Sequence, residues 1–431
     1  MSESNRRGEV ALLFVLAAIQ FTHIMDFMIM MPLGPQLMRD LQIGPGYFSA
    51  FVAVYTITSG VVGLLAAPFI DRFDRRKLLL VVYAGFGVAT LACALAQNAS
   101  TLLVARAVSG AFGGVSTSLV MAIVGDVVPA QRRAAAVGII MTAFSVAAAM
   151  GVPFGLQLAQ RFQWEAPFFV LAGLAGLTWV FAFMRLPSVR GHLQEAKSPA
   201  RVFGELLRDA NAGRALLFMA AVVFGHFAII PLMSPYMVGN MGLPERDLFL
   251  VYFTGGALSV FTAPLIGKLA DSFGRFRVFS VLVVIACAVT LAISHSGPRP
   301  VWVILFLGGS FFVFASGRFV PGQAIMTLAV PASRRGAFMS LSGCARDIAM
   351  GVTSSIGGWV VTREPSGQLV NFHWLGWIAV AAAVLSLWLG RRVIVNDVAV
   401  SPEPPTNPYV LSVVASASSL NPQLSAKNQR T

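Results

Sequence analysis

The sequence predicts an all-α polytopic membrane protein with twelve transmembrane helices in two pseudo-symmetric six-helix bundles. Three observations support this fold class. The chain is 57% hydrophobic and only 11% charged, a composition that a soluble domain of this length could not solvate. Its apolar residues form runs of about 20, the length that crosses a hydrocarbon core of ~30 Å. Two polar loops recur at a nearly constant spacing, which indicates a duplicated half.

Twelve apolar runs meet the length test. They cover residues 10–33, 46–70, 78–96, 100–127, 135–160, 166–187, 214–238, 247–270, 278–297, 301–330, 336–362 and 373–390. The polar segment 188–213 separates six runs from six, and we expect it to be a cytoplasmic linker with an amphipathic surface helix. The predicted domains are therefore a first bundle over 1–187, this linker, a second bundle over 214–391 and a tail over 392–431. The tail is rich in Pro, Ser and Asn, which is typical of disorder.

The distribution of basic residues predicts the orientation. One set of loops, which includes both ends of the transmembrane region, carries 21 Lys and Arg side chains. The opposite set carries 5, namely Arg39, Arg161, Arg246, Arg299 and Arg363. Positive loops mark the cytoplasm, so both termini are predicted to be cytoplasmic. The net charge of +13 is then a topology signal, and no aromatic or motif pattern supports nucleic-acid binding.

The duplicated half is visible in two pairs of loops. Asp71, Phe73 and Arg75 recur as Asp271, Phe273 and Arg275, an offset of 200. The segment 128–133, which reads Val-Pro-Ala-Gln-Arg-Arg, recurs at 330–335 with an offset of 202. Repeated halves across a membrane are the usual architecture of secondary transporters.

The loop at 67–76 resembles the signature loop of the major facilitator superfamily, Gly-x-x-x-Asp-Arg-x-Gly-Arg-Arg. Ala67 and Asp74 replace two of its glycines, whereas the second copy keeps Gly267 and Gly274. The resemblance covers roughly residues 9–391. It implies that the loop aspartate caps a helix of the opposite half and that the arginine bridges to an acid at the end of the fourth helix. The gating residues implied in this way are Asp71, Arg72, Arg75, Arg76, Asp126, Asp271, Arg275 and Arg277. The alternative is a solvated turn that only fixes topology.

Polar side chains inside the apolar runs are the candidate site residues, because such groups are costly at bilayer depth. The cavity and substrate candidates are Gln20, Tyr55, His226, Arg318, Arg346 and Asp347. In the family, helices 1, 4, 7 and 10 line the central cavity, and four of the five helices that carry a charged or imidazole side chain here are those four. Structural ion pairing is the alternative for the pair on the eleventh helix, and a satisfied core histidine is the alternative for His226.

Three residues are the candidates for proton coupling: His23, Asp26 and Arg106. At ~1.5 Å of rise per residue, Asp26 lies about 25 Å from the cytoplasmic start of its helix and Arg106 about 9 Å from the outer start of its own. Both fall in the outer third of a ~30 Å slab, where they can pair. His23 is three residues from Asp26 and shares its helix face. A purely structural pair is the alternative.

Two glycine motifs add to the resemblance. Arg106 with Gly110, Gly113 and Gly114 resembles the fourth-helix motif that the family associates with proton transfer, and its glycines permit close helix approach. Gly151, Pro153 and Gly155 resemble the fifth-helix motif of family antiporters, although the proline is one place late and Leu156 replaces a glycine. With the Trp-containing loop at 163–165, this pattern resembles the twelve-helix, drug:proton antiporter and arabinose-efflux-permease-like branch. The alternative is a kinked helix that only packs.

The function that follows is secondary active transport, with efflux of a drug, sugar or metabolite in exchange for protons. Proton symport for uptake, and a non-transporting sensor or assembly factor on the same scaffold, are the alternatives. No nucleotide-binding loop and no catalytic set occurs, so we expect no enzyme activity and no cofactor. The three cysteines predict neither a disulfide framework nor a metal site. We expect a monomer in the inner (plasma) membrane, with a small molecule and protons as partners.

Overall fold

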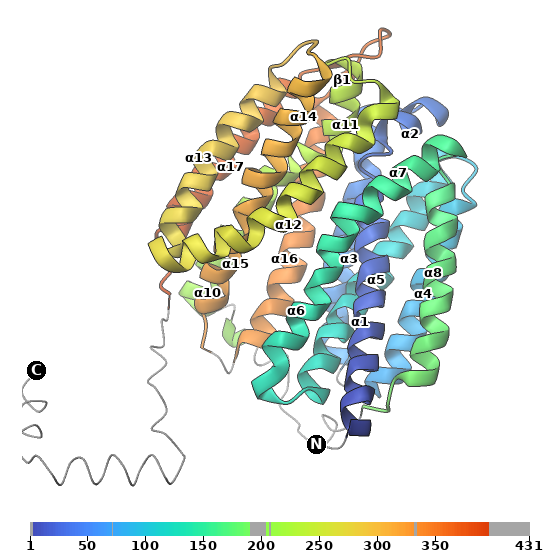
Figure 1. The fold of residues 1–431 in the computed structure, drawn as a ribbon, viewed down its shortest axis with the longest axis vertical. Coiled ribbons are helices and arrows are strands. Elements are labelled where there is room, and N and C mark those ends of the chain that lie inside the picture. Colours follow the sequence, from blue (N-terminus) through green and yellow to red (C-terminus); the bar gives the residue numbers. More distant parts are fainter. Residues whose placement is uncertain (1–2, 71, 190–203, 207, 332–333, 396–431) are drawn as a thin grey trace, which may run out of the picture. The chain divides into compact units, whose positions relative to one another are not determined.

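Figure 1 shows the computed structural model, which describes residues 3–70, 72–189, 204–206, 208–331 and 334–395. Helices dominate, so the predicted all-α class is confirmed. The first set of elements is α1 (Glu3–Ile29), α2 (Gly34–Asp40), α3 (Pro45–Ile70), α4 (Arg75–Ala94), α5 (Ala99–Val127), α6 (Ala130–Val146), the π-helical η1 (Ala147–Gly151), α7 (Val152–Arg161) and α8 (Ala166–Arg185).

The second set follows residue 203. It consists of α10 (Ala210–Phe227), α11 (Ile230–Gly239), the 3₁₀ turn η3 (Glu245–Asp247), α12 (Leu248–Phe273), α13 (Arg275–Ser294), α14 (Val301–Ser310), the π-helical η4 (Phe311–Ser316), α15 (Phe319–Leu328), α16 (Arg335–Val360), β1 (Thr362–Arg363), β2 (Leu369–Val370) and α17 (Phe372–Gly390). The two short strands pair antiparallel, with Thr362 opposite Val370. They form a small hairpin between the last two long helices.

Eleven helical stretches of the described chain are long and apolar enough to cross a membrane. They coincide with eleven of the twelve predicted runs. The remaining run, 336–362, forms the 26-residue helix α16 but is not among the eleven. Its Arg346, Asp347 and many Ser and Gly residues make it less apolar, and α16 can carry them because it packs against α3 and α10.

The duplication is visible in how each set begins. α1 ends at Ile29 and the chain turns before α2, just as α10 ends at Phe227 and turns before α11. The signature turns, however, close differently. Gly274 precedes α13 with a φ of 94°, a conformation that favours glycine. Asp74 precedes α4 with a φ of −58° and accepts a hydrogen bond from the Arg76 backbone N–H, so this aspartate is an N-cap.

Close packing of α5 on α3 explains one of the predicted glycines. A Cβ at Gly110 would lie 2.1 Å from the Tyr55 carbonyl oxygen, a distance that no side chain tolerates. The Thr58 hydroxyl of α3 donates to the Ala107 carbonyl at 2.9 Å beside this contact. The predicted role of these glycines, close helix approach, agrees with the packing.

The two sets join at the end where α2, α7, α11 and the hairpin lie, which is the predicted outer end (Figure 1). Arg39 in the last turn of α2 donates to the Glu245 carboxylate at 2.5 Å. Gln160 of α7 donates to the Glu245 carbonyl at 2.7 Å. Further along the same boundary, α3 packs against α16 and η1 packs against α12. Polar and apolar contacts thus hold the sets together at this end.

Several predicted features lie outside the described residues. They are Asp71, most of the linker (190–203 and 207) and most of the tail (396–431). The predicted domain boundaries therefore stay predictions.

Candidate functional site

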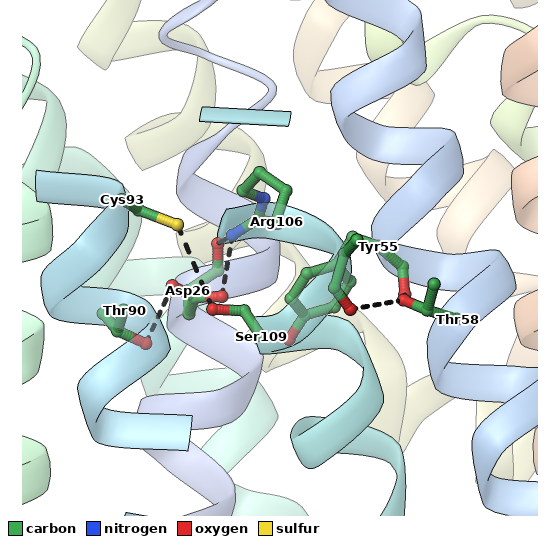
Figure 2. Close-up of polar contacts among 8 residues, drawn as sticks. Asp26, Tyr55, Thr58, Thr90, Cys93, Arg106 and Ser109 are labelled. Atoms are coloured by element: carbon green, nitrogen blue, oxygen red, sulfur yellow. Dashed lines mark hydrogen bonds and ion pairs between the residues drawn. The ribbon is translucent and has the colours of Figure 1, made fainter. Parts of the chain in front are cut away.

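Asp26 of α1 and Arg106 of α5 form an ion pair that is fully buried, and Figure 2 shows it. The Arg106 Nη1 lies 2.7 Å from the Asp26 Oδ2, and both side chains have zero exposure. The same nitrogen donates to the Asp26 carbonyl oxygen at 3.2 Å. Thr90 of α4 donates to the other carboxylate oxygen at 3.4 Å. The structure therefore brings together two of the three predicted coupling residues, and Thr90 is an addition that the sequence reasoning missed.

Tyr55 of α3 completes the surroundings of Arg106. The guanidinium carbon lies 4.1 Å from the centre of the Tyr55 ring, a cation–π contact that is worth about 2 kcal/mol when desolvated. The Arg106 Nε and Nη2 and the Tyr55 hydroxyl have no hydrogen-bond partner among the described residues. Buried polar atoms are nearly always satisfied, so this group can bind a polar ligand or water.

His23 lies one helical turn from Asp26 and contacts α5. Its Nδ1 is 3.4 Å from the Thr117 hydroxyl, and its Nε2 has no partner in the described structure. A Cβ at Gly113 would lie 2.4 Å from the His23 ring, so this glycine makes room for the imidazole. Gln20, one further turn along α1, is also buried, with its Oε1 unsatisfied. The predicted candidates on α1 thus face the same polar region.

His226 and Arg318 occupy the second set and form no comparable pair. The His226 ring stacks on Phe311, with ring centres 5.3 Å apart, and its edge meets Phe319. Arg318 donates to the Val222 carbonyl oxygen at 3.3 Å, is buried, and makes no ion pair within the described chain. Of these two buried arginines, Arg106 of the first set therefore has a counter-charge, whereas Arg318 of the second set has none among the described residues.

A chain of aromatic rings connects these two regions. The Phe27 ring stacks on Tyr55 at 5.7 Å and contacts the Phe227 ring of α10 at 5.9 Å. Phe227 in turn meets His226 at 5.6 Å. The sequence reasoning missed these two phenylalanines, although the offset of 200 that pairs the signature loops also pairs Phe27 with Phe227.

Asp347 and Arg346 of α16 separate from each other. The Ser59 hydroxyl of α3 donates to the Asp347 carboxylate at 2.6 Å, which is a polar contact between the two sets. Arg346 lies 3.5 Å from the Gln323 amide oxygen of α15. Neither residue makes an ion pair within the described chain, so their alternative interpretation as structural ion pairs is not supported.

The signature loop forms part of the predicted latch. The Arg75 Nε lies 2.8 Å from the Asp126 carboxylate at the end of α5, while Asp71 lies outside the described residues. The guanidinium carbon of Arg72 lies 5.2 Å from the centre of the Phe69 ring. The Arg76 guanidinium donates to the Phe183 carbonyl oxygen at 2.6 Å. In the second copy, Arg275 lies 4.0 Å from Asp271 and Arg277 is exposed.

The fifth-helix motif packs on α1. A Cβ at Gly151 would lie 2.6 Å from the Met25 sulfur, and one at Gly155 would lie 2.7 Å from the Ile29 Cδ1. Gly151 ends the π-helical turn η1, and Pro153 is buried in the first turn of α7. A π-turn in a helix is frequent at functional sites. The two glycines bring α7 close to the helix that carries Asp26.

Comparison with known proteins identifies similar chains. A family model described as Major Facilitator Superfamily matches residues 16–317. The MFS-type transporter YtbD of Bacillus subtilis is 25% identical over 401 residues, which are 89% of this chain and 96% of that protein. A probable sugar efflux transporter of Helicobacter pylori is 26% identical over 262 residues, 61% of this chain and 65% of the relative.

Solved structures share the fold. A D-xylose-proton symporter superposes with a TM-score of 0.71 at 15% identity, covering 89% of this chain and 98% of the other. A bacterial homologue of the human lysosomal transporter Spinster, in an inward-facing and occupied conformation, gives a TM-score of 0.69 at 14% identity over 91% of this chain and 98% of the other.

Proposed function

Because the chain belongs to the major facilitator superfamily, we propose that this multi-pass membrane transporter exports a small molecule in exchange for protons. The observation that carries the proposal is the fully buried Asp26–Arg106 pair. A buried ion pair is seldom retained for stability, because apolar residues of similar volume do as well or better. An ion pair that breaks when its carboxylate takes up a proton can couple proton movement to substrate movement.

The proton switch is Asp26, because an arginine side chain keeps its proton in proteins. Protonation of the Asp26 carboxylate removes the negative charge opposite Arg106. The guanidinium then retains the Tyr55 ring and the Asp26 carbonyl oxygen, and its free N–H groups can turn to an incoming substrate. His23 lies one helical turn from Asp26 on the same face of α1, which makes it the candidate for passing the proton.

The driving force is adequate for efflux. One proton moving through 100 mV releases ~2.3 kcal/mol, which supports a gradient of about fifty-fold at ~1.4 kcal/mol per decade. The aromatic chain from Tyr55 to His226 suits a weakly polar or amphiphilic substrate, because apolar walls with few polar groups are typical of small-molecule sites. The similarity to a probable sugar efflux transporter supports export.

We assign the structure to a state that is closed at the predicted outer end. The contacts of Glu245 with Arg39 and Gln160 support this assignment. Opening to the outside would then require these contacts to break.

The orientation behind this assignment has a direct test. Single cysteines at Ser100 and Ser366 are expected to react with an impermeant thiol reagent added to intact cells, and one at Ser198 is not. The native cysteines are first replaced by alanine, and permeabilised cells give the positive control for Ser198. Labelling at Ser198 in intact cells would reverse the predicted orientation, and the end that is called outer here would then face the cytoplasm.

The transport proposal is tested in three steps. Metabolite and drug-resistance profiles of cells lacking or overproducing the protein identify a substrate. Inverted vesicles then give the direction, because an exporter accumulates substrate when the vesicle interior is acidified. Accumulation driven by the opposite gradient would show symport, and no transport of any profiled compound would favour a sensor or assembly factor.

Proteoliposomes test the coupling site. Asp26→Asn is expected to abolish pH-driven accumulation and to keep downhill substrate exchange, whereas Arg106→Ala impairs both. Thr90→Ala is the matched control, because it removes a 3.4 Å contact to the same carboxylate without removing a charge. If Asp26→Asn still accumulates substrate against its gradient, Asp26 is not the coupling site and Asp347 is the next residue to test.

A further inference from the structure

A pocket at the predicted outer end of the second set has no role in the transport proposal. Its cavity volume is about 440 Å³, and its walls come from the end of α11, the turn after α13, the hairpin strand β2 and the start of α17. Two of the chain's five histidines, His295 and His373, line it. None of the described residues that line it is a lysine or an arginine.

Two polar side chains of the pocket wall bond to the backbone of other wall residues. The Tyr236 hydroxyl donates to the Ser296 carbonyl oxygen at 2.8 Å, and its ring stacks on Phe372 with centres 4.0 Å apart. The Asn240 side chain exchanges two hydrogen bonds with the Leu369 backbone, at 2.9 and 2.8 Å. These contacts make the wall a built structure.

The two imidazoles are different, because they keep free nitrogens. The His295 Nδ1 lies 3.0 Å from the Leu291 carbonyl oxygen, which can only accept. It also lies 3.1 Å from the Ser294 hydroxyl, which can accept because its own proton goes to the same carbonyl at 3.3 Å, so this nitrogen carries the proton. The His295 Nε2 is then a lone-pair donor. No hydrogen bond to the His373 ring occurs within the described residues. A backbone carbonyl that fixes the tautomer in this way is the usual support of a metal-binding histidine.

We propose that His295 and His373 together bind a divalent transition-metal ion of the zinc class at the predicted outer face. Their ring centres are 5.9 Å apart. With Zn–N bonds of about 2.0–2.1 Å, two rings on one tetrahedral ion have centres about 5 Å apart. A side-chain rotation that moves either ring centre by less than about 1 Å closes the difference. The His295 side chain is exposed and therefore has room for this rotation.

The site takes two protein ligands and completes its shell with water. No group of three or more potential ligand residues occurs in the described chain, so the affinity is modest and the ion remains exchangeable. Both histidines belong to the second set, and the ion would tie the turn after α13 to the start of α17. Because no residue of the first set takes part, binding is independent of the proposed transport cycle.

Zinc binding is measured by calorimetry on the purified full chain at pH 7.5, with an affinity tag that contains no histidine. The expected result is one site per chain, with affinity at least tenfold weaker in His295→Gln and in His373→Gln. His192→Gln is the matched control, because it removes a histidine elsewhere in the sequence, and it should bind like the parent. Unchanged binding in either pocket variant, or loss in the control, would overturn the proposal.

A second measurement places the ion. Trp377 and Trp374 lie beside the two imidazoles, with ring centres 6.0 Å from His295 and 5.3 Å from His373. Cu²⁺, a paramagnetic ion that favours imidazole ligands, should therefore quench tryptophan fluorescence. The double variant Trp374→Phe/Trp377→Phe should lose most of that quenching and keep zinc binding. Quenching that survives in the double variant would place the ion elsewhere and refute the pocket.

Discussion

Removal of Arg106 should make the stability of the protein depend on pH in a way that the parent does not. In Arg106→Gln the buried Asp26 carboxylate loses its counter-charge, and breaking a buried pair costs about 3–5 kcal/mol. The carboxyl group avoids part of this cost by taking up a proton. The native state then binds one proton more than the unfolded state, in which the carboxyl is ionised above about pH 5.

The sign and size of the effect follow from proton linkage. When the native state binds the extra proton, stability falls as pH rises, by about 1.36 kcal/mol per pH unit. The cost of Arg106→Gln should therefore be about 2.7 kcal/mol smaller at pH 6 than at pH 8. Asp26→Asn leaves an unpaired guanidinium that cannot lose its proton, so its cost should be the same at both pH values.

Thermal unfolding of the detergent-solubilised protein at pH 6, 7 and 8 measures these differences. Each single variant is compared with the parent at the same pH, which cancels the contributions of other titrating groups. The double variant Asp26→Asn/Arg106→Gln has no buried charge at this site and should cost less than either single change. If the cost of Arg106→Gln is equal at pH 6 and pH 8, Asp26 does not take up a proton when its partner is absent, and its role as the proton switch is refuted.

Three further predictions concern packing and gating. Gly113→Ala should destabilise the protein by about 1–3 kcal/mol in thermal unfolding, because its Cβ would lie 2.4 Å from the His23 ring. Gly125→Ala on the same helix is the control, since its Cβ would meet nothing within 4 Å, and it should be neutral or stabilising. Ser59→Ala removes the hydrogen bond to Asp347, and a hydrogen bond to a charged group is worth about 1.5–3 kcal/mol. The variant should therefore shift the distances between spin labels on α3 and α16. Unchanged distances would argue against a gating role for this hydrogen bond. Asp71→Asn should slow transport while insertion and ligand affinity persist, and transport at the normal rate would leave the loop as a topology anchor only.

Hydropathy and the repeat were sufficient to predict the helices and the depth of the polar residues. The rise per residue placed Asp26 and Arg106 at the same depth, and the structure places them 2.7 Å apart. A depth estimate works here because a helix in a bilayer has a known length and only its rotation is unknown. The glycines of α5 indicate part of its rotational orientation, because they lie on the face that packs on α3.

The contacts between the two sets could not be predicted in the same way. The hydrogen bond from Ser59 to Asp347 joins residues 288 positions apart, and no periodicity within either helix records which helix of the other set it meets. The case of α16 is related, because the run 336–362 forms the predicted helix but is not among the eleven stretches that are apolar enough to count as spans. Its polar groups are accommodated by neighbouring helices, and composition alone does not distinguish a protein-facing surface from a lipid-facing one.

The aspartate that caps α4 also holds the chain that leaves α8. Its carboxylate accepts from the Ser188 hydroxyl at 2.7 Å and from the Val189 backbone N–H at 3.4 Å, and the Arg75 N–H donates back to the Val189 carbonyl at 3.3 Å. These three hydrogen bonds, which together form a clasp, tie the first turn of α4 to the chain that leaves α8, so the two segments should move together. A spectroscopic label placed at Leu186, just before the clasp, would therefore report the displacement of α4 without altering the signature loop itself.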